Sequence, residues 1–278
     1  MAPLDWTPKF KTHPPKTKYA TLSYPSPNIL LVTLNRPKEL NCINSEGHKE
    51  LLEVWNWLDE EESLRVGIIT GNGRAFCAGA DLKEWNTNNE DEKPHPFPIG
   101  GFGGLSRRSG LKPIIAAVNG ICFGGGCEII INLDMILASK NASFALPEVK
   151  IGVVAVAGAL PRLARTIGKP RAMEMALTGR TVSAKEAAEW GLVNQVIEDE
   201  NVVDAAIEMA KLISANSPDA VIVTREGVKY GWEGVSVEEG TRLWSEGWYP
   251  KLLRGENMRE GVKSFVEKRK PVWKPAKL

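Results

Sequence analysis

The stretch that most constrains this fold is an apolar run, Ile114–Val118, followed closely by the three consecutive glycines Gly124–Gly126. The apolar run has the β-branched character of a buried strand. Residues 127–131 (CEIII) follow the glycines at once and predict a helix with a single carboxylate, that of Glu128. Because glutamate is seldom fully buried unless it is paired or has a chemical task, Glu128 needs an explanation. The alternative is a solvent-facing side chain on an ordinary helix.

Composition excludes several classes of protein. The chain has 278 residues and 43% apolar content, enough for one large domain or a core with an appendage. Its 35 Lys and Arg residues balance 34 Asp and Glu residues, so neither nucleic acid nor an anionic membrane is an expected partner. No apolar run is long enough to span a membrane, and we expect a soluble protein. The four cysteines lack zinc-binding spacing, and no metal site is predicted.

The order of predicted elements indicates three parts. Residues 1–27 are rich in proline, lysine and threonine and predict an extended arm. A strand at 28–35, a helix at 45–62 capped by Ser45, and a strand at 66–70 together indicate an α/β crossover unit. Helical patterns dominate from residue 201 onward. We therefore divide the chain into an arm (1–27), an α/β core (28–200) and a helical C-terminal region (201–278).

A second loop of small residues resembles the glycine-rich stretch. Residues 75–84 (AFCAGADLKE) follow a strand and a Gly-Asn-Gly turn, much as residues 119–128 (NGICFGGGCE) follow theirs. Two such loops side by side could each offer a backbone N–H to one ligand oxygen, although they could also be unrelated tight turns. Glycines that open a helix favour anions, and without a P-loop lysine a developing oxyanion fits better than a phosphate. Residues 86–110 predict either a mobile lid or a plain surface loop.

A second isolated acid, Glu148, follows Glu128 by twenty residues, within Phe144–Val149. Two carboxylates in one apolar site would have pKa values pushed apart, which leaves one as a base and the other as an acid. Spacing alone leaves open whether the two side chains meet.

Three segments carry a resemblance to a known family: residues 75–84, 119–128 and 144–163 (FALPEVKIGVVAVAGALPRL). Together they resemble the crotonase, or enoyl-CoA hydratase/isomerase, family, from about residue 28 to the C-terminus. The resemblance implies an α/β fold built as a spiral of ββα units, with a helical C-terminal region at subunit contacts. It also implies trimers that commonly pair into hexamers. The substrate would be an acyl-CoA, with coenzyme A as part of the substrate and no separate cofactor.

The same resemblance assigns roles to residues. The backbone N–H groups of Ala80 and Gly125 match the family's oxyanion hole, which holds the thioester carbonyl. Glu128 and Glu148 match the two glutamates that hold and activate a water, which adds to C3 of a 2-enoyl-CoA while C2 receives a proton. The family's segment along the coenzyme A groove is matched by Ala78, Asp81, Leu82 and Lys83, with Lys83 a candidate phosphate neighbour.

Departures from the family pattern concern the acyl end of the pocket. Leu146 stands where familiar hydratases carry a glutamine, and residues 153–159 are more apolar than their counterparts. An unusual acyl group is therefore expected, and a branched C5 to C6 acyl-CoA is one specialised candidate. Val156 stands where dienoyl-CoA isomerases of the family have an aspartate, which disfavours that reaction.

These residues predict a 2-enoyl-CoA hydratase, or the same enzyme working as a 3-hydroxyacyl-CoA dehydratase. The alternatives are double-bond isomerisation through a CoA enolate, and a non-catalytic binding protein, including an RNA-binding one. The chain ends in Ala276-Lys277-Leu278, which resembles a peroxisomal import tripeptide. We therefore expect a peroxisomal matrix location, with an import receptor as partner.

Overall fold

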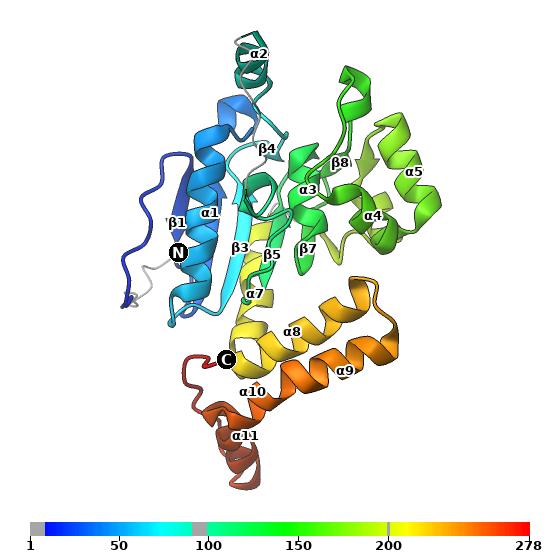
Figure 1. The fold of residues 1–278 in the computed structure, drawn as a ribbon. Helices are drawn as coiled ribbons and strands as arrows, with labels where there is room; N and C mark the ends of the chain where they lie inside the picture. Colours follow the sequence, from blue (N-terminus) through cyan, green and yellow to red (C-terminus); the bar gives the residue numbers. More distant parts are fainter. Residues whose placement is uncertain (1–8, 91–98, 199–200) are drawn as a thin grey trace.

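The computed structural model describes residues 9–90, 99–198 and 201–278, and Figure 1 shows an α/β body above a group of C-terminal helices. The body contains two sheets. The larger sheet has the order β1 (Ala20–Ser23), β2 (Ile29–Leu34), β3 (Val66–Gly71), β5 (Ile114–Val118), β7 (Met135–Ser139) and β10 (Gln195–Ile197). The smaller sheet has the order β4 (Ala75–Cys77), β6 (Ile121–Phe123), β8 (Ser143–Ala145) and β9 (Val182–Ser183). β1 and β9 run antiparallel to their neighbours, and the other pairs are parallel.

Successive strands alternate between the two sheets. β3 is followed by β4 and α2 (Leu82–Glu90), β5 by β6 and α3 (Gly125–Ile131), and β7 by β8 and the short helix η3 (Glu148–Ile151). This repeat confirms the predicted spiral of ββα units. Because β4, β6 and β8 are parallel, the loops that follow them leave the smaller sheet at one edge.

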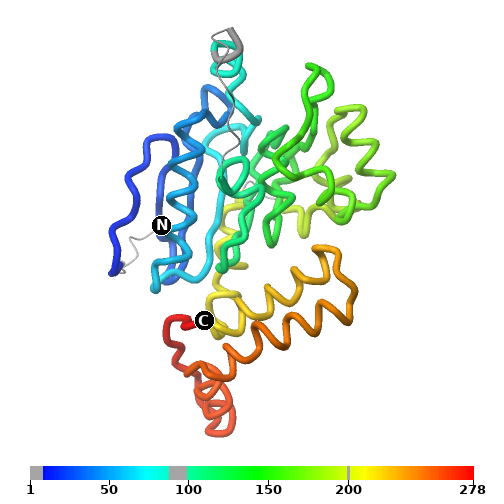
Figure 2. The backbone as a smooth tube through the Cα atoms, viewed as in Figure 1, coloured from blue at the N-terminus to red at the C-terminus, as the bar shows by residue number. Residues whose placement is uncertain are grey.

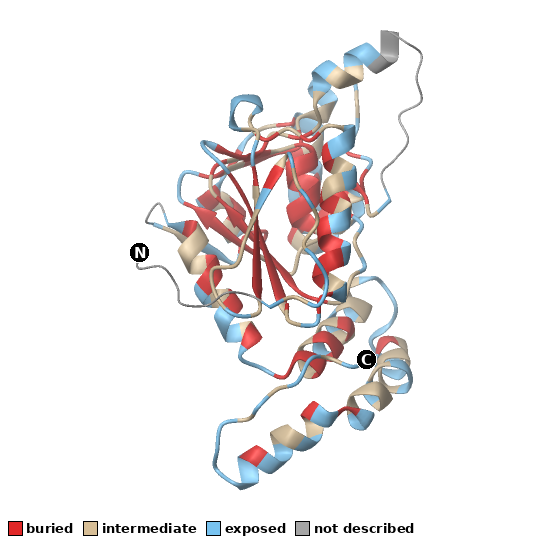
Figure 3. Ribbon diagram, turned by 90° about the vertical axis from the view of Figure 1, so that its left-hand side faces the viewer, coloured by how far each residue is buried: buried red, intermediate tan, exposed pale blue. Residues whose placement is uncertain are grey.

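The central strands are buried on both faces, as parallel strands in α/β proteins are. In β2, Leu30 and Val32 share a cluster with α1 (Ser45–Glu60), whereas Ile29 and Leu31 belong to a second cluster with α7 (Val202–Ser214). The two-residue alternation of a strand produces this division. Figure 3 shows the resulting buried layers through the sheet and its flanking helices.

The sequence-based division at residue 200 separates α7 from the sheet, yet the structure packs them together. Ala206 and Ala210 of α7 are completely buried in the same cluster as Ile68 and Ile115. The helical periodicity of α7 resembles that of the helices after it, and only the tertiary contacts show that α7 covers the second face of the sheet. By packing, α7 therefore belongs with the α/β layers.

Two local predictions near the N-terminus were wrong. Residues 20–23 lie in the predicted extended arm but form β1, which pairs with β2 from Ala20↔Leu34 to Ser23↔Leu31. Ser45 is the first residue of α1 and does not cap it, because the Asn44 side chain accepts the hydrogen bond from the Gly47 N–H at 2.9 Å.

The remaining helical segments lie around the smaller sheet or below the body. They are η1 (Pro37–Glu39), η2 (Phe102–Gly104), α4 (Ala159–Ile167), α5 (Lys169–Thr178), α6 (Ala184–Glu189), α8 (Pro218–Trp232), α9 (Val237–Gly247), α10 (Tyr249–Arg254) and α11 (Glu256–Val266). Arg225 of α8 links the lower helices to the body, since its Nε donates to Asp134 Oδ1 at 2.6 Å and its Nη1 to the Gly110 carbonyl at 2.6 Å. None of the helices in the described ranges is long and apolar enough to cross a membrane.

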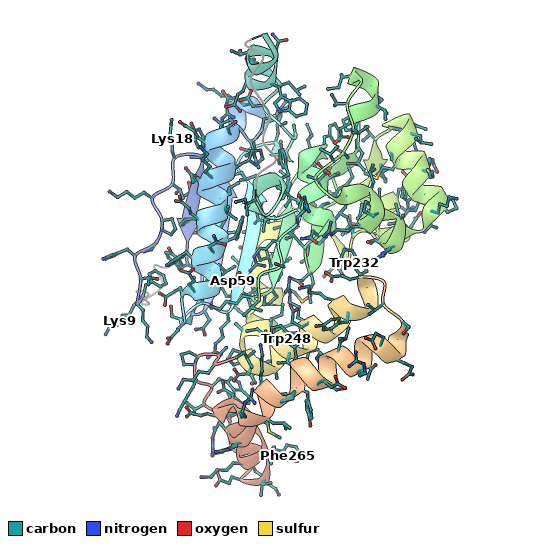
Figure 4. All side chains as sticks on the ribbon, in the orientation of Figure 1. Lys9, Lys18, Asp59, Trp232, Trp248 and Phe265 are labelled. Atoms are coloured by element: carbon teal, nitrogen blue, oxygen red, sulfur yellow. The ribbon has the colours of Figure 1, made fainter. Side chains whose placement is uncertain are left out.

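The aromatic residues of the C-terminal region are buried to different degrees. Trp244 Nε1 donates to the Val223 carbonyl at 2.7 Å, and Trp248 is half-buried under the Lys251 ammonium, 4.1 Å from the ring centre. Tyr249, in contrast, is 41% exposed. Figure 4 places Phe265 on α11, far from the body, and its side chain is 86% exposed.

Candidate functional site

The two loops of small residues lie against each other at the edge of the smaller sheet. β4 and β6 pair in parallel, with Cys77 opposite Cys122, so both chains leave the sheet in the same direction. A Cβ atom on Gly79 would lie 3.2 Å from the Gly125 nitrogen and 3.7 Å from the Gly124 Cα. The loop that contains Ala80 and the glycine-rich turn are therefore in van der Waals contact, and the structure brings together the two segments expected to be neighbours.

The backbone N–H groups of Ala80 and Gly125 are both free to bind a ligand. Ile43 N donates to the Gly79 carbonyl at 3.0 Å and Asp81 N donates to the Ile43 carbonyl at 3.2 Å. In such a parallel bridge the N–H of the residue between them, Ala80, points away from Ile43. Gly125 is the first residue of α3, where N–H groups have no acceptor within the helix. Within the described residues, neither N–H donates to a backbone carbonyl.

Glycine is required at two places in this turn. Gly124 has φ 54° and ψ −123°, which a residue with a side chain rarely adopts. A Cβ on Gly126 would lie 2.2 Å from the Cys77 carbonyl oxygen. The glycines thus let α3 begin directly against β4 and place the positive end of the helix dipole at the two free N–H groups.

Glu128 lies in the first turn of α3 and is 5% exposed. Its Oε1 accepts a hydrogen bond from the Ala159 N–H at 3.5 Å. Burial, and then the nearby charge of Glu148, raise the pKa of Glu128 from 4.5 to about 7. The solvent-facing alternative for Glu128 is therefore excluded, because the side chain is buried and close enough to Glu148 to feel its charge.

Glu148 begins η3 and is half-buried. Its Oε1 lies 3.4 Å from the position of a Cβ on Gly124, so the carboxylate faces the glycine turn. Burial raises the pKa of Glu148 as well. Its Oε2 is buried and has no hydrogen-bond partner in the described part of the chain. Since buried polar atoms are almost always satisfied, this oxygen indicates a position for a water or substrate atom.

The residues predicted along the coenzyme A groove divide into two kinds. Leu82 and Lys83 are exposed in the first turn of α2 and are free to contact a ligand, and Ala78 is half-buried just before them. Asp81 has structural partners instead. Its Oδ2 accepts from Arg36 Nη2 at 2.9 Å, and its Oδ1 accepts from the Lys83 N–H at 3.2 Å at the start of α2.

The acyl end also differs from expectation. Leu146 is 1% exposed and packs in the main core, so it offers almost no surface to a ligand. Val154 and Val156 are more than half exposed. They belong to the segment that closes over Glu128, because the Ala157 and Ala159 backbones both hydrogen-bond to its carboxylate. The apolar surface at this end therefore comes from residues 153–159.

Sequence reasoning missed a buried wedge, residues 101–106, that packs behind the loops containing Ala80 and Gly125. Of the predicted lid or surface loop at 86–110, residues 91–98 lie outside the described residues, but Gly101–Ser106 are buried. The Phe102 ring packs directly on Gly125, where a Cβ would lie 2.4 Å from it. Ser106 Oγ accepts from the Phe102 N–H and donates to the Ala157 carbonyl, both at 2.8 Å. The wedge therefore joins the start of α3 to the segment over Glu128.

His48 of α1 completes the wedge, although it lies outside the distinctive stretches of sequence. Its Nδ1 accepts the Gly103 N–H at 2.9 Å, and its ring meets Phe102 edge-on, with centroids 4.6 Å apart. Burial lowers the pKa of His48 to about 4, which keeps it neutral. The glycine-rich run was the available signal, since Gly100, Gly101, Gly103 and Gly104 all have positive φ and let the chain fold tightly around Phe102.

Comparison with known proteins gives the family. A family model described as enoyl-CoA hydratase/isomerase matches residues 25–276. The chain belongs to the enoyl-CoA hydratase/isomerase family. A crystal structure of an enoyl-CoA hydratase from Mycobacterium tuberculosis superimposes with a TM-score of 0.84 at 36% identity, over 93% of this chain and 99% of the other. The crotonase-type fold is thereby confirmed.

Named relatives make the activity more specific. A mevalonyl-coenzyme A hydratase of Aspergillus fumigatus is 53% identical over 264 residues, which is 95% of this chain and 98% of the relative. A second protein of that name, from Beauveria bassiana, is 52% identical and covers 97% of this chain and 99% of the relative. A carnitinyl-CoA dehydratase of Proteus mirabilis is 42% identical over 89% of this chain and 95% of its own length. The chain is an acyl-CoA hydro-lyase, and the predicted hydratase activity is confirmed over a non-catalytic binding role. Coenzyme A enters as part of the substrate, and this class of hydratase needs no further cofactor.

Proposed function

We propose that this enzyme adds water reversibly to a branched 2-enoyl-CoA, and that mevalonyl-CoA is the hydrated form. The observation that carries the catalytic part is the buried pair Glu128 and Glu148 beside two free backbone N–H groups. Neither an isolated carboxylate nor an anion site alone would serve addition of water across a double bond, whereas together they supply both proton transfers and a place for the developing charge.

The two N–H groups act on the thioester. The carbonyl oxygen accepts hydrogen bonds from the backbone N–H groups of Ala80 and Gly125. These bonds strengthen as water attacks C3 and the electrons of the C2=C3 double bond are displaced toward that oxygen in the enolate-like transition state. The dipole of α3 contributes in the same direction, because Gly125 is its first residue. The loss of one such donor typically costs about 10²- to 10³-fold in rate.

The two glutamates act on the water. Its oxygen bonds to C3 while one O–H bond breaks and passes a proton to the ionised carboxylate of the pair. The protonated carboxyl of the pair gives its proton to C2. The pair ends with the same number of protons as it began, so no other acid or base is needed. A pKa of about 7 for Glu128, raised partly by the charge of Glu148, suits a pair that holds one proton near neutral pH.

The acyl group is proposed from the relatives and the pocket. Two proteins named mevalonyl-coenzyme A hydratase share more than half of their residues with this chain over nearly its full length. Mevalonyl-CoA carries a methyl and a hydroxyl on C3, and its dehydration gives 5-hydroxy-3-methyl-2-pentenoyl-CoA and water. Val154 and Val156 provide apolar surface for a branched chain.

A substrate panel with mass detection tests this proposal. Purified enzyme is offered 5-hydroxy-3-methyl-2-pentenoyl-CoA, crotonyl-CoA and crotonobetainyl-CoA. We expect a gain of one water and the highest kcat/KM on the first. Conversion without a change in mass would favour the isomerisation alternative, and preference for crotonobetainyl-CoA would favour the chemistry named for the 42% relative. Equal rates on branched and straight substrates would contradict the proposed acyl group.

We also propose a peroxisomal location and a trimeric assembly. The location rests on the tripeptide Ala276-Lys277-Leu278. An N-terminally tagged protein that stays in peroxisomes after deletion of these three residues would contradict it. The assembly, a trimer or a pair of trimers, is supported by the exposed apolar side chains of Val262, Phe265 and Val266 on one stretch of α11. Sedimentation of a monomer at micromolar concentration would contradict it.

A further inference from the structure

The chain end is bound by two buried polar side chains far from the active site. Asp219, in the first turn of α8, is 1% exposed, and Asn257, in the first turn of α11, is 2% exposed. Asn257 Nδ2 donates to Asp219, and both side chains then face the last residues of the chain. Burial of a carboxylate and an amide is costly unless their hydrogen bonds are satisfied, so their partners show what this site is built to hold.

Those partners are main-chain groups of residues 274–277. Asn257 pairs with Lys274 at both of its amide atoms, since Nδ2 donates to the Lys274 carbonyl at 3.0 Å and Oδ1 accepts the Lys274 N–H at 2.8 Å. Asp219 Oδ1 accepts the Lys277 N–H at 2.9 Å. Hydrogen bonds to main-chain groups in this way hold an extended segment whatever side chains that segment carries.

Further contacts fasten the same segment from both sides. The Trp273 Nε1 donates to the Ala215 carbonyl at 2.8 Å, and Arg65 of the body reaches the Trp273 carbonyl at 3.3 Å. The Lys277 ammonium bonds Glu256 at 3.1 Å. Figure 2 shows the chain end returning from α11 to the start of α8, beneath the body.

The side chains of the end tripeptide are also engaged. Ala276 and Leu278 are half-buried and line a cavity of about 200 Å³ together with Leu64 and Ile222. A receptor that reads the end of a chain needs its terminal side chains and main-chain groups free. In the folded enzyme the Lys277 N–H, the Lys277 ammonium and part of the Leu278 side chain already have partners within the same molecule.

We propose that residues 273–278 are a docked peptide held in a binding site made by Asp219 and Asn257, and that docking withholds the import tripeptide from its receptor. The masking rests on the peroxisomal assignment proposed above. Docking and receptor binding then compete for one segment, so the apparent affinity of the receptor falls by the fraction of molecules whose tail is free. Release of the tail, rather than its presence, controls recognition.

Binding of the purified full-length protein to the peptide-binding domain of the import receptor tests this. A synthetic peptide of residues 269–278 serves as the reference for a free tail. We expect the unaltered enzyme to bind at least about tenfold more weakly than the peptide, and Asn257→Ala to bind within about threefold of the peptide. Glu246→Gln is the control, because it removes only an exposed ion pair to Arg242 on α9, which does not contact the tail, and it should leave the affinity within about twofold of the unaltered enzyme.

The outcomes separate the two proposals. A peptide that fails to bind the receptor overturns the import assignment and the masking with it. If the peptide binds the receptor and the full-length enzyme binds it equally tightly, the masking proposal alone is overturned. Because Asn257→Ala could impair folding, amide hydrogen exchange of the unaltered protein gives an independent reading. The Lys274 and Lys277 N–H groups should be protected, and exchange as fast as in the peptide would show that the tail is not docked.

Discussion

Glu128→Gln should stabilise the free protein at high pH. In the folded state, burial and the Glu148 charge raise the pKa of Glu128 from 4.5 to about 7. A carboxyl whose pKa is higher in the folded than in the unfolded state contributes stability below the unfolded pKa and loses it as pH rises through the folded pKa. Glu128 therefore leaves the free energy of unfolding almost unchanged below about pH 4.5, lowers it increasingly up to about pH 7, and lowers it by the full amount above that.

The size of the effect follows from the same shift. At 1.36 kcal/mol for each pH unit, a rise from 4.5 to about 7 corresponds to about 3 kcal/mol. Glutamine has nearly the same shape and no charge, and its side-chain oxygen can keep the hydrogen bond from the Ala159 N–H. We expect the variant to unfold about 6 °C or more above the unaltered protein at about pH 8.5, and only about 2 °C above it at about pH 5.

Thermal unfolding at equal protein concentration, at these two pH values, measures the effect. Glu53→Gln, at an exposed glutamate on α1, is the control and should change the midpoint little at either pH. If Glu128→Gln gave no gain at the higher pH, or the same gain at both, the side chain would not be held as a desolvated acid and the reasoning would be refuted.

Three further predictions concern the oxyanion turn, the proton count and the lower helices. Gly125→Ala should lower kcat about 10²- to 10³-fold in steady-state hydration assays, because its Cβ would lie 2.4 Å from the Phe102 ring. Phe102→Leu in the same protein should restore part of the rate. An unaffected kcat in Gly125→Ala would argue against an oxyanion role. The pH profile of kcat/KM should fall about tenfold per unit above about pH 7, where the carboxylate pair loses its last proton, and a flat profile to higher pH would contradict the one-proton pair. Arg225→Met should lower the free energy of unfolding by about 1 to 3 kcal/mol, because it leaves Asp134 without its partner on α8. Thermal or urea unfolding measures the change, and an unchanged midpoint would show that the pair contributes nothing.

The sequence was most informative where the constraint is local. The apolar run of β5 and the glycines at the start of α3 predicted a strand, a tight turn and a helix N-terminus, because each depends on residues within a few positions. The two carboxylates could be named for the same reason, as polar residues out of place in apolar surroundings. That they meet depends on the parallel pairing of β4, β6 and β8, which no local pattern encodes.

The features that were missed all depend on distant partners. β1 forms because its residues pair with the edge of β2, and the Phe102 wedge is buried because α1 and α3 pack over it. Asn257 looks like an ordinary polar residue of an exposed helix until the chain end returns to it from 17 positions away. In each case the residue type permits the arrangement, and long-range packing decides it.

The central claim is that one buried carboxylate pair carries out both proton transfers of the hydration. Rates for Glu128→Gln and Glu148→Gln with the branched enoyl-CoA test it most directly, with binding of a non-reactive acyl-CoA as evidence that each variant still folds and holds substrate. We predict that each substitution alone lowers kcat by about 10²-fold or more while acyl-CoA binding changes little. A variant of either glutamate that hydrates at the rate of the unaltered enzyme would contradict the claim.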